Sequence, residues 1–238
     1  MTGLVHTLLL AALLAFLASR LGVWVRIRSW LRTRHTGAGA SAAARARQLR
    51  TPAVRIAGLL NIPTQRGRQA QRWEAGAAGE RRTAERLRTL EREGWTVLHD
   101  RALPRSRANL DHLVISPTGR VYLPDTKRYS SQWPLTVANG RLYHGDRDVT
   151  QRLDGLYYET RETASILGVP VMPLVVMDGP PMPENGLSLD GLRIIPAHRL
   201  REELRAVDRA CSLPHRSPSA LAHTARRELP AYTQGARR

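Results

Sequence analysis

Cysteine and aromatic residues are scarce in this sequence of 238 residues. Cys211 is the only cysteine, which excludes an internal disulfide and a zinc cluster of thiolates, and suits a reducing compartment. Aromatic residues make up 5% of the chain, so a nucleic-acid surface built mainly from stacked aromatic platforms is not expected. No paired histidine ligands, G-x-S-x-G motif or phosphate-cradling G-x-x-x-x-G-K-[ST] motif occurs. These absences argue against a zinc enzyme, an α/β-hydrolase and a P-loop NTPase.

Acidic residues are absent before Glu74, whereas 12 arginines precede it. The whole chain carries a formal charge of +17, and such an excess indicates a polyanionic partner, either nucleic acid or anionic lipid. Of the 37 basic residues, 36 are arginine and Lys127 is the only lysine. Lysine has a compact ammonium group whose pKa responds to its surroundings, so Lys127 is a candidate functional residue.

One long apolar run stands near the start, LVHTLLLAALLAFLASRLGVWV over residues 4–25. As a helix it spans about 33 Å, against a hydrocarbon core of about 30 Å. A basic flank follows it, so the positive-inside rule places the rest of the chain in the cytoplasm. We therefore predict a transmembrane helix over residues 1–25, a single-pass anchor in the cell membrane assisted by the basic flank. A cleaved signal peptide and an amphipathic surface helix are the alternative interpretations.

The remaining chain divides into a linker, a domain and a tail. Residues 26–70 are rich in Ala, Arg, Gly and Gln, which predicts a basic linker with a short helix near Pro52–Leu60. Its arginines are either a solvated tether or contacts to lipid or nucleic acid. Residues 71–208 have the pattern of a folded domain, and residues 209–238 are predicted to be a mobile basic tail.

Hydrophobic periodicity predicts an α/β fold with a central mixed sheet flanked by helices. The order is a helix, antiparallel strands joined by turn residues, a helix, two strands and a helix. The predicted helices cover residues 71–94, 148–167 and 198–207, and the predicted strands cover residues 95–99, 110–115, 120–127, 135–137, 141–144, 169–177 and 192–196.

Two aspartates and the lone lysine fall on two strands that the turn SPTG makes neighbours. Asp125 and Lys127 are two residues apart, so their side chains point to one face of the sheet. Asp111, on the preceding strand, shares its face with apolar residues. Burying such charges costs free energy unless they bind a ligand. Mg²⁺ is a suitable ligand, because it binds through one or two carboxylates plus a substrate phosphate. A cross-strand salt bridge is the alternative.

The stretch ANLDHLVISPTGRVYLPDTKRY resembles the core of the nuclease-related domain (NERD) family, a branch of the PD-(D/E)XK nuclease superfamily. GAAGE at residues 76–80 is similar to the family's Gly-x-x-Gly-Glu helix motif. The resemblance covers roughly residues 71–180 and identifies residues 71–208 as a NERD-like nuclease domain. It implies a PD-(D/E)XK-like fold that hydrolyses phosphodiesters with metal-activated water.

The resemblance also implies a role for each matching residue. Asp111 and Asp125 match the metal-binding acids, Glu80 the helix glutamate that completes or orients the metal shell, and Lys127 the catalytic lysine. The carbonyl of Thr126 is a further expected metal ligand. Asp125 departs from the family pattern, which more often has Glu at this place. His112 points away from Asp111 along the strand, so we expect it to be packed or hydrogen-bonded.

The sequence thus predicts a membrane-anchored nuclease that cleaves DNA with Mg²⁺, or alternatively Mn²⁺, with RNA as the alternative substrate. The competing interpretation is a non-catalytic adaptor that keeps the nuclease fold and binds nucleic acid or serves at the membrane.

Overall fold

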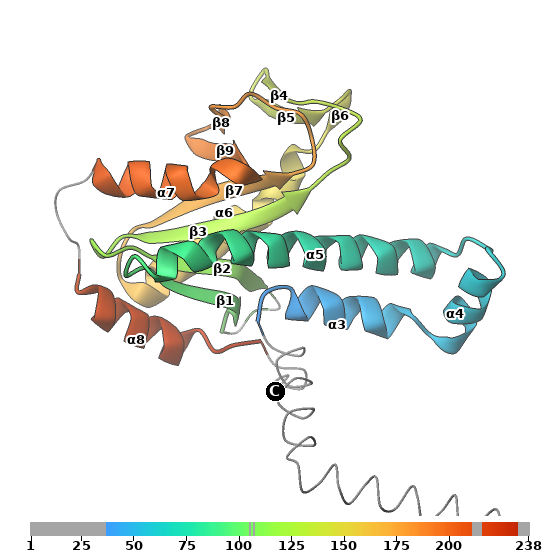
Figure 1. Cartoon of the computed structure of the whole chain (residues 1–238), viewed down its shortest axis with the longest axis horizontal. Helices are drawn as coiled ribbons and strands as arrows, with labels where there is room; N and C mark the ends of the chain where they lie inside the picture. Colours follow the sequence, from blue (N-terminus) through green and yellow to red (C-terminus); the bar gives the residue numbers. More distant parts are fainter. Residues whose placement is uncertain (1–36, 105, 107, 211–215, 233–238) are drawn as a thin grey trace, which may run out of the picture. The chain divides into compact units, whose positions relative to one another are not determined.

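The computed structural model describes residues 37–232 except 105, 107 and 211–215. The predicted anchor over residues 1–25 and its flank lie outside these residues. Across the described part, no helix is both long and apolar enough to cross a membrane. Figure 1 shows the elements in chain order, which are α3 (Ala40–Leu49), α4 (Pro52–Leu59), α5 (Gln65–Glu91), β1 (Thr96–Ala102), β2 (Asn109–Ile115), β3 (Val121–Arg128), β4 (Leu135–Ala138), β5 (Arg141–His144), β6 (Arg147–Asp148), the 3₁₀ turn η1 (Thr150–Leu153), α6 (Asp154–Leu167), β7 (Val171–Asp178), β8 (Leu187–Leu189), β9 (Leu192–Pro196), the 3₁₀ turn η2 (Ala197–Arg199), α7 (Leu200–Arg209) and α8 (Pro218–Glu228).

A six-stranded mixed sheet forms the centre, with strand order β1-β2-β3-β7-β9-β8. The first three strands are antiparallel, β7 and β9 run parallel to β3, and β8 is antiparallel at the edge. The crossover from β3 to β7 contains α6, as a parallel connection requires. The prediction of a central mixed sheet with helices is confirmed. The strands β4, β5 and β6 form a separate antiparallel sheet.

Helices cover both faces of the central sheet, because side chains on its strands alternate between two apolar clusters. One cluster contains Leu113, Leu123 and Val175 together with the buried leucines of α6 and α8. The other contains Val114 and Val176 together with the buried leucines of α5 and α7. Asp111 and Asp125 continue the series of the first cluster, so the sequence directs them to the α6 side.

The structure differs from the predicted linker over residues 26–70. The short helix near Pro52 is present as α4, but α3 precedes it and α5 already begins at Gln65. The α3 helix packs on α5 through four buried alanines, at positions 40, 42, 44 and 46. Gly39 comes so close to α5 that an added Cβ would lie 2.7 Å from the carbonyl oxygen of Ala77. Small side chains on both helices therefore make this region part of the fold.

The predicted tail over residues 209–238 also contains structure. Helix α8 buries Leu221, Ala222 and Ala225 against the sheet. Beyond it, the N–H of Ala102 donates to the carbonyl of Pro230, and the N–H of Tyr232 donates to that of Asp100. The segment after α8 thus pairs with the outer edge of β1, which covers an edge that would otherwise be open.

Candidate active site

The hydrogen-bond ladder between β2 and β3 stops after two residue pairs. Only Val114 with Tyr122 and Ile115 with Val121 are paired. Along an antiparallel ladder, hydrogen-bonded residue pairs alternate with pairs that are not hydrogen-bonded. In the turn, the N–H of Ser116 donates to the carbonyl of Arg120, which marks that pair as a hydrogen-bonded one. The same register would next require an N–H from Pro124, which has none. The sequence thus opens a gap between the two strands at Pro124.

Asp111 occupies this gap. Continuing the register would place Asp111 opposite Asp125, the two predicted metal-binding acids. Instead of a ladder bond, the N–H of Thr126 donates to the Asp111 carboxylate over 3.1 Å. Since N–H and C=O of one strand residue point to the same side, the carbonyl of Thr126 also faces the gap. Two carboxylates and a backbone carbonyl therefore meet where the strands separate.

Helix α5 brings Glu80 to the same place because Gly79 allows a close approach. An added Cβ on Gly79 would lie 3.3 Å from the methyl group of Thr126. The hydroxyl of Thr126 donates to that of Thr83, one turn further along the helix. Glu80 is 7% exposed, and its Oε2 has no hydrogen-bond partner among the described residues. The GAAGE segment thus serves to hold a buried glutamate over the gap.

Lys127 lies beside these acids and forms an ion pair with one of them. Its Nζ is 2.6 Å from Oδ2 of Asp125, which has no other partner within the described part of the chain. Burial lowers the pKa of Lys127, but the carboxylates of Asp125, Asp111 and Glu159 outweigh it, so the net pKa is raised. The lysine is therefore a stable ammonium at neutral pH.

Burial and mutual repulsion make ionisation of the acids around Lys127 unfavourable, so their pKa values are raised. Burial raises the pKa of Glu80 to about 8, and the charges of Asp100 and Asp125 add to the rise. Burial, Glu80 and Asp125 raise the pKa of Asp111 well above its ordinary value, against the opposing effect of Lys127. One ammonium does not compensate the carboxylates that share this space.

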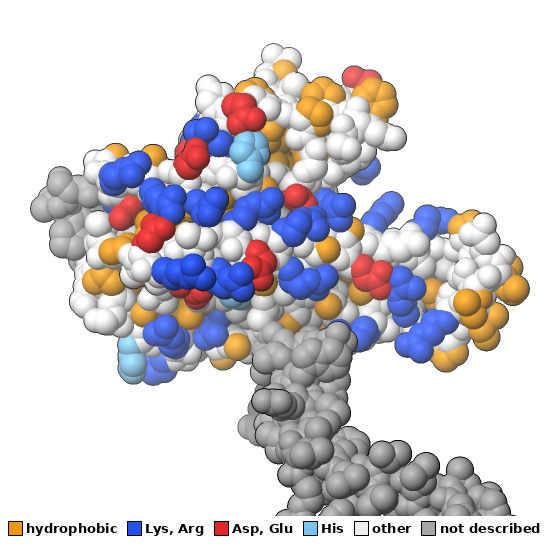
Figure 2. Space-filling model, in the orientation of Figure 1, with side chains coloured by type: hydrophobic (Ala, Val, Ile, Leu, Met, Phe, Trp, Pro, Cys, Tyr) orange, Lys and Arg blue, Asp and Glu red, His pale blue; other side chains and the backbone are white. Residues whose placement is uncertain are grey.

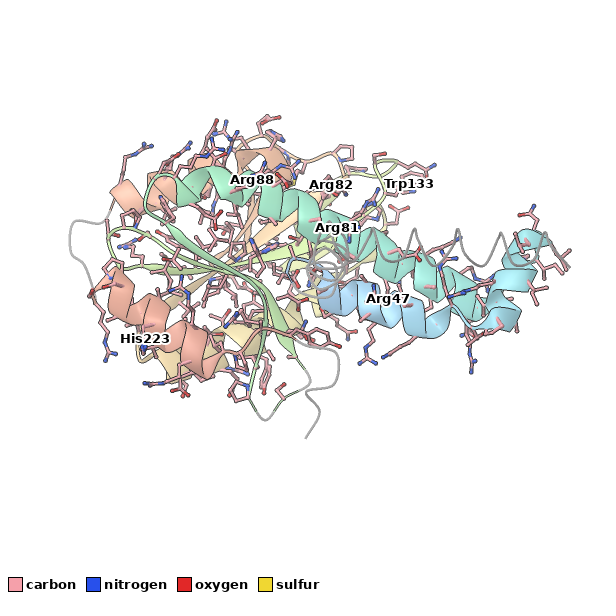
Figure 3. All side chains as sticks on the ribbon, turned by 60° about the horizontal axis from the view of Figure 1, so that its bottom comes forward. Arg47, Arg81, Arg82, Arg88, Trp133 and His223 are labelled. Carbon is pink, nitrogen blue, oxygen red and sulfur yellow. The ribbon has the colours of Figure 1, made fainter. Side chains whose placement is uncertain are left out.

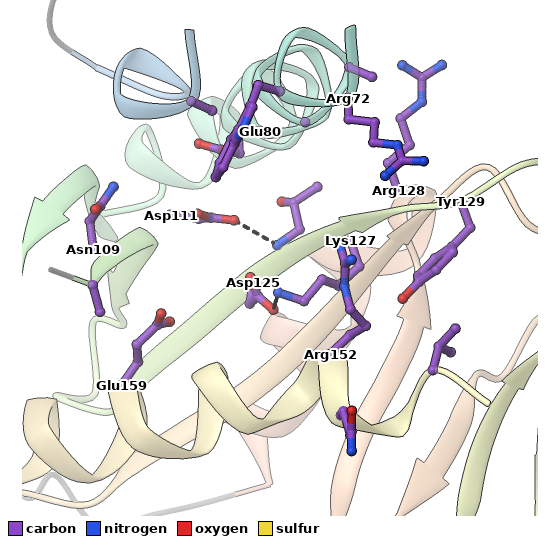
Figure 4. Close-up of a pocket in the computed structure, with 18 of the residues that line it drawn as sticks. Arg72, Glu80, Asn109, Asp111, Asp125, Lys127, Arg128, Tyr129, Arg152 and Glu159 are labelled. Atoms are coloured by element: carbon purple, nitrogen blue, oxygen red, sulfur yellow. Dashed lines mark hydrogen bonds and ion pairs between the residues drawn. The ribbon is translucent and has the colours of Figure 1, made fainter. Parts of the chain in front are cut away.

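Glu159 is a further member of the site that the sequence reasoning missed. It comes from α6, on the opposite side of the ion pair from Glu80 (Figure 4). Burial and the charge of Asp125 raise its pKa to about 8, while Lys127 lowers it. The signal was present, because Glu159 follows Leu156 by three residues and precedes Thr163 by four, both of which are buried.

A hydrogen-bonded support lies behind these acids. Asp100, in the left-handed conformation with φ of 47°, accepts from the N–H of Ser41 at the start of α3. The amide of Asn109 donates to Asp100 and to the hydroxyl of Ser41. The carboxylate thus caps α3 and ties this helix to β1 and β2. The start of α3 is thereby fixed next to the site.

These residues line one groove of about 1920 Å³. Glu80 and Asp125 are buried at its floor, and Asp111, Glu159 and Lys127 are partly exposed to it. Exposed arginines surround them, on α3, α5, β3, β5, β6 and η1, and in chain order they are Arg45, Arg72, Arg128, Arg141, Arg147 and Arg152. Arg141 pairs with Asp148, and Arg128 lies 3.8 Å from Asp178. The other four have no ion pair with the residues described, so the groove combines an acidic floor with a basic rim.

The structure thus brings together all five residues that the sequence selected, Glu80, Asp111, Asp125, Thr126 and Lys127. It does not gather them into a ready metal cage, since the described residues contain no group of three or more His, Cys, Asp and Glu side chains arranged as ligands. His112 is buried on the other face, with its Nδ1 2.8 Å from Nδ1 of His99. It is hydrogen-bonded, as expected.

The mixed sheet, with acids and a lysine meeting at a gap between two strands, defines an α/β protein with a charged site at the strand gap. Residues 75–177 match the family model described as nuclease-related domain. The match agrees with the resemblance to that family seen in the sequence, and it includes every acid and the lysine of the site. It supports a nuclease-type hydrolase in general. No curated protein and no solved structure matches the chain significantly.

Proposed function

We propose that the protein hydrolyses phosphodiester bonds of DNA in a reaction that depends on a divalent cation. The observation that carries the proposal is the set of buried carboxylates around one ammonium at the floor of a basic groove. Most buried polar groups that serve only the fold are satisfied by partners, whereas Glu80 Oε2 has none in the described part of the chain. A substrate and its cation would supply what these groups lack.

The residues fit a Mg²⁺ ion, with Mn²⁺ as the alternative. Asp111, Asp125 and the carbonyl of Thr126 would hold it, because Mg²⁺ takes oxygen ligands and completes its shell with water and substrate phosphate. Glu80 would orient a water in that shell. Fewer than three protein carboxylates suffice for such a site, so the absence of a ready cage does not conflict with it. The bound ion would supply a water of lowered pKa and neutralise charge on the phosphate.

Lys127 would stabilise the charge that grows on the phosphoryl oxygens. Its raised pKa keeps it protonated, so it donates hydrogen bonds and does not serve as the base. Glu159 would hold a proton for the leaving oxygen, since a pKa of about 8 leaves it protonated at neutral pH. Water adds to phosphorus and releases one proton to the solvent, the ester P–O bond breaks, and the leaving oxygen takes up the proton of Glu159, which is then protonated again from the solvent.

The basic rim would bind the nucleic-acid backbone. Arg72 and Arg128 lie together at one side of the site, and Arg152 lies across from them (Figure 4). Arginine forks match phosphate oxygens bidentately. Arg72 and Arg152 have no ion pair among the described residues, so they are available for phosphates on both sides of Lys127.

The test is DNA cleavage by the full chain in detergent, with Mg²⁺, Mn²⁺ or a chelator, and with RNA in a parallel assay. We expect Asp125→Asn and Lys127→Ala to lose roughly a hundredfold or more in rate. The control Asp190→Asn removes an exposed carboxylate outside the groove and keeps a residue type that tolerates the left-handed φ of 48°. Equal activity of all variants, or cleavage in the chelator, would refute the proposal. DNA binding without cleavage by the wild type would establish the adaptor instead.

For the location, we propose that residues 1–25 anchor the protein in the cell membrane with its nuclease domain in the cytoplasm. Fractionation with the membrane, with the N-terminal sequence intact, is expected. Recovery of a chain shortened at its start would indicate a signal peptide.

A further inference from the structure

An apolar surface lies at the far end of the α3–α5 pair, remote from the groove. It consists of Ile56, Leu59, Leu60 and Ile62, which are 58%, 87%, 65% and 55% exposed. We call these four residues the α4 tip. Figure 2 shows hydrophobic side chains gathered at this end of the molecule, with arginines beside them. Single exposed leucines are common, but four neighbouring ones indicate a binding surface.

The α4 tip has a fixed shape. Helix α4 starts with Pro52 at its first position. Just beyond its end, Asn61 is in the left-handed conformation, φ 56°, and the N–H of Ile62 donates to the carbonyl of Ala57 over 2.8 Å. A second bond joins the N–H of Asn61 to Gly58. This double closure is the Schellman motif, which holds the apolar residues on either side of Asn61 in place.

The chain that forms the α4 tip and its surroundings is strongly basic. Residues 37–73 contain seven arginines and no acid. Arg55, Arg66 and Arg68 are exposed close to the tip in the chain, and none has an ion pair with a described residue. Arg50 pairs with Glu74, which fastens α3 to α5 behind the tip. Figure 3 shows that the arginines continue along α5, with Arg81, Arg82 and Arg88 labelled.

We propose that the α4 tip inserts into the surface of an anionic lipid bilayer. Such a surface offers hydrocarbon for Ile56, Leu59, Leu60 and Ile62 and phosphate for the arginines, which is the pairing that interfacial helices use. Nucleic acid would match the arginines but not the aliphatic side chains. A second copy of the chain would bring like charges together. The α4 tip shares no residue with the groove or with the predicted anchor, so the proposal does not depend on either.

The experiment reports insertion at one position of the full chain. An environment-sensitive nitrobenzoxadiazole dye is attached to Leu59→Cys in a Cys211→Ser background, and the matched control carries the dye on Ser219→Cys, an exposed position of α8. Vesicles of phosphatidylcholine with about a third phosphatidylglycerol serve as the membrane. We expect a several-fold rise in emission and quenching by nitroxide lipids for the label at 59 only. In this background, Leu60→Ser should weaken the partition of the tip roughly tenfold.

Charge reversal gives a second measurement. Arg55→Glu with Arg66→Glu should reduce the signal from the label at 59, as should replacing the anionic lipid by phosphatidylcholine. The inference is overturned if the label at 59 stays in water while the protein sediments with the vesicles. A dye that is already in an apolar environment without vesicles would also overturn it. In that case, dye emission that depends on protein concentration would identify a second copy as the partner that covers the α4 tip. Emission that does not depend on concentration would identify another segment of the same chain.

Discussion

Replacing Glu80 by glutamine should stabilise the protein at neutral and alkaline pH while abolishing the proposed DNA cleavage. The pKa of Glu80 rises from 4.5 to about 8 on folding, chiefly because the carboxyl group is buried. The protonated carboxyl group contributes to the free energy of unfolding, and this contribution is fully present below pH 4.5 and is lost as the pH rises towards about 8. Each pH unit in this window costs about 1.4 kcal/mol, so the wild type loses of the order of 4 kcal/mol by about pH 8.

Glutamine carries no such charge. Its amide leaves one donor to satisfy near the position of Oε2, which costs about 1 kcal/mol. Glu80→Gln should therefore be nearly neutral at about pH 5 and more stable than the wild type by roughly 2–4 kcal/mol at about pH 8. Added Mg²⁺ should stabilise the wild type at the higher pH more than the variant, because a cation at Asp111 and Asp125 favours the ionised carboxylate.

Urea unfolding of the full chain, followed by tryptophan fluorescence to which the buried Trp95 contributes, measures this difference at each pH. Glu85→Gln is the matched control on the same helix, because its side chain is 65% exposed and pairs with Arg88. We expect less than about 0.5 kcal/mol for that control at every pH. A Glu80→Gln variant that is less stable than the wild type by the same amount at all pH values would refute the reasoning, since it would show that the carboxylate is well compensated.

Three further results are expected. Glu159→Gln should lower the cleavage rate at least roughly tenfold and flatten the alkaline limb of the pH–rate profile, since the wild type loses this proton above about pH 8; an unchanged profile would remove Glu159 from the reaction. Gly79→Ala should be about 1–3 kcal/mol less stable in thermal unfolding than Gly76→Ala on the same helix, because its new methyl group meets Thr126 whereas Gly76 faces open space. Arg72→Ala should raise KM at constant kcat and lower the slope of log affinity against log salt by about one, and a fall in kcat alone would contradict its role in binding.

Local chemistry was enough to predict the strands that carry the site. The apolar alternation of β2 and β3, with the turn between them, sets which residues share a face, and Asp125 and Lys127 follow from that period. The gap between these strands was not predicted. It depends on the register, because only the paired arrangement places Pro124 where a donor is due, and pairing is a property of two segments together.

Two helices outside the predicted domain, α3 and α8, were missed for different reasons. Every buried side chain of α3 is alanine, which gives a weak apolar signal, and the helix is recognisable only beside the small residues of α5. Helix α8 had a readable pattern, with Leu221, Ala225 and Leu229 four residues apart after a Ser-Pro start. Both segments are rich in arginine, so their charge is a stronger signal in the sequence than their apolar periodicity.

The single lysine gives this site a chemical property that the rest of the chain lacks. Amine-reactive reagents have only Lys127 and the amino terminus to modify, and they react with the neutral amine. The ion pair with Asp125 suppresses that form. A divalent cation bound to the Asp125 carboxylate would break this ion pair and favour the neutral amine. The acylation rate of Lys127 would then report cation occupancy, and mass spectrometry can measure it without an engineered probe.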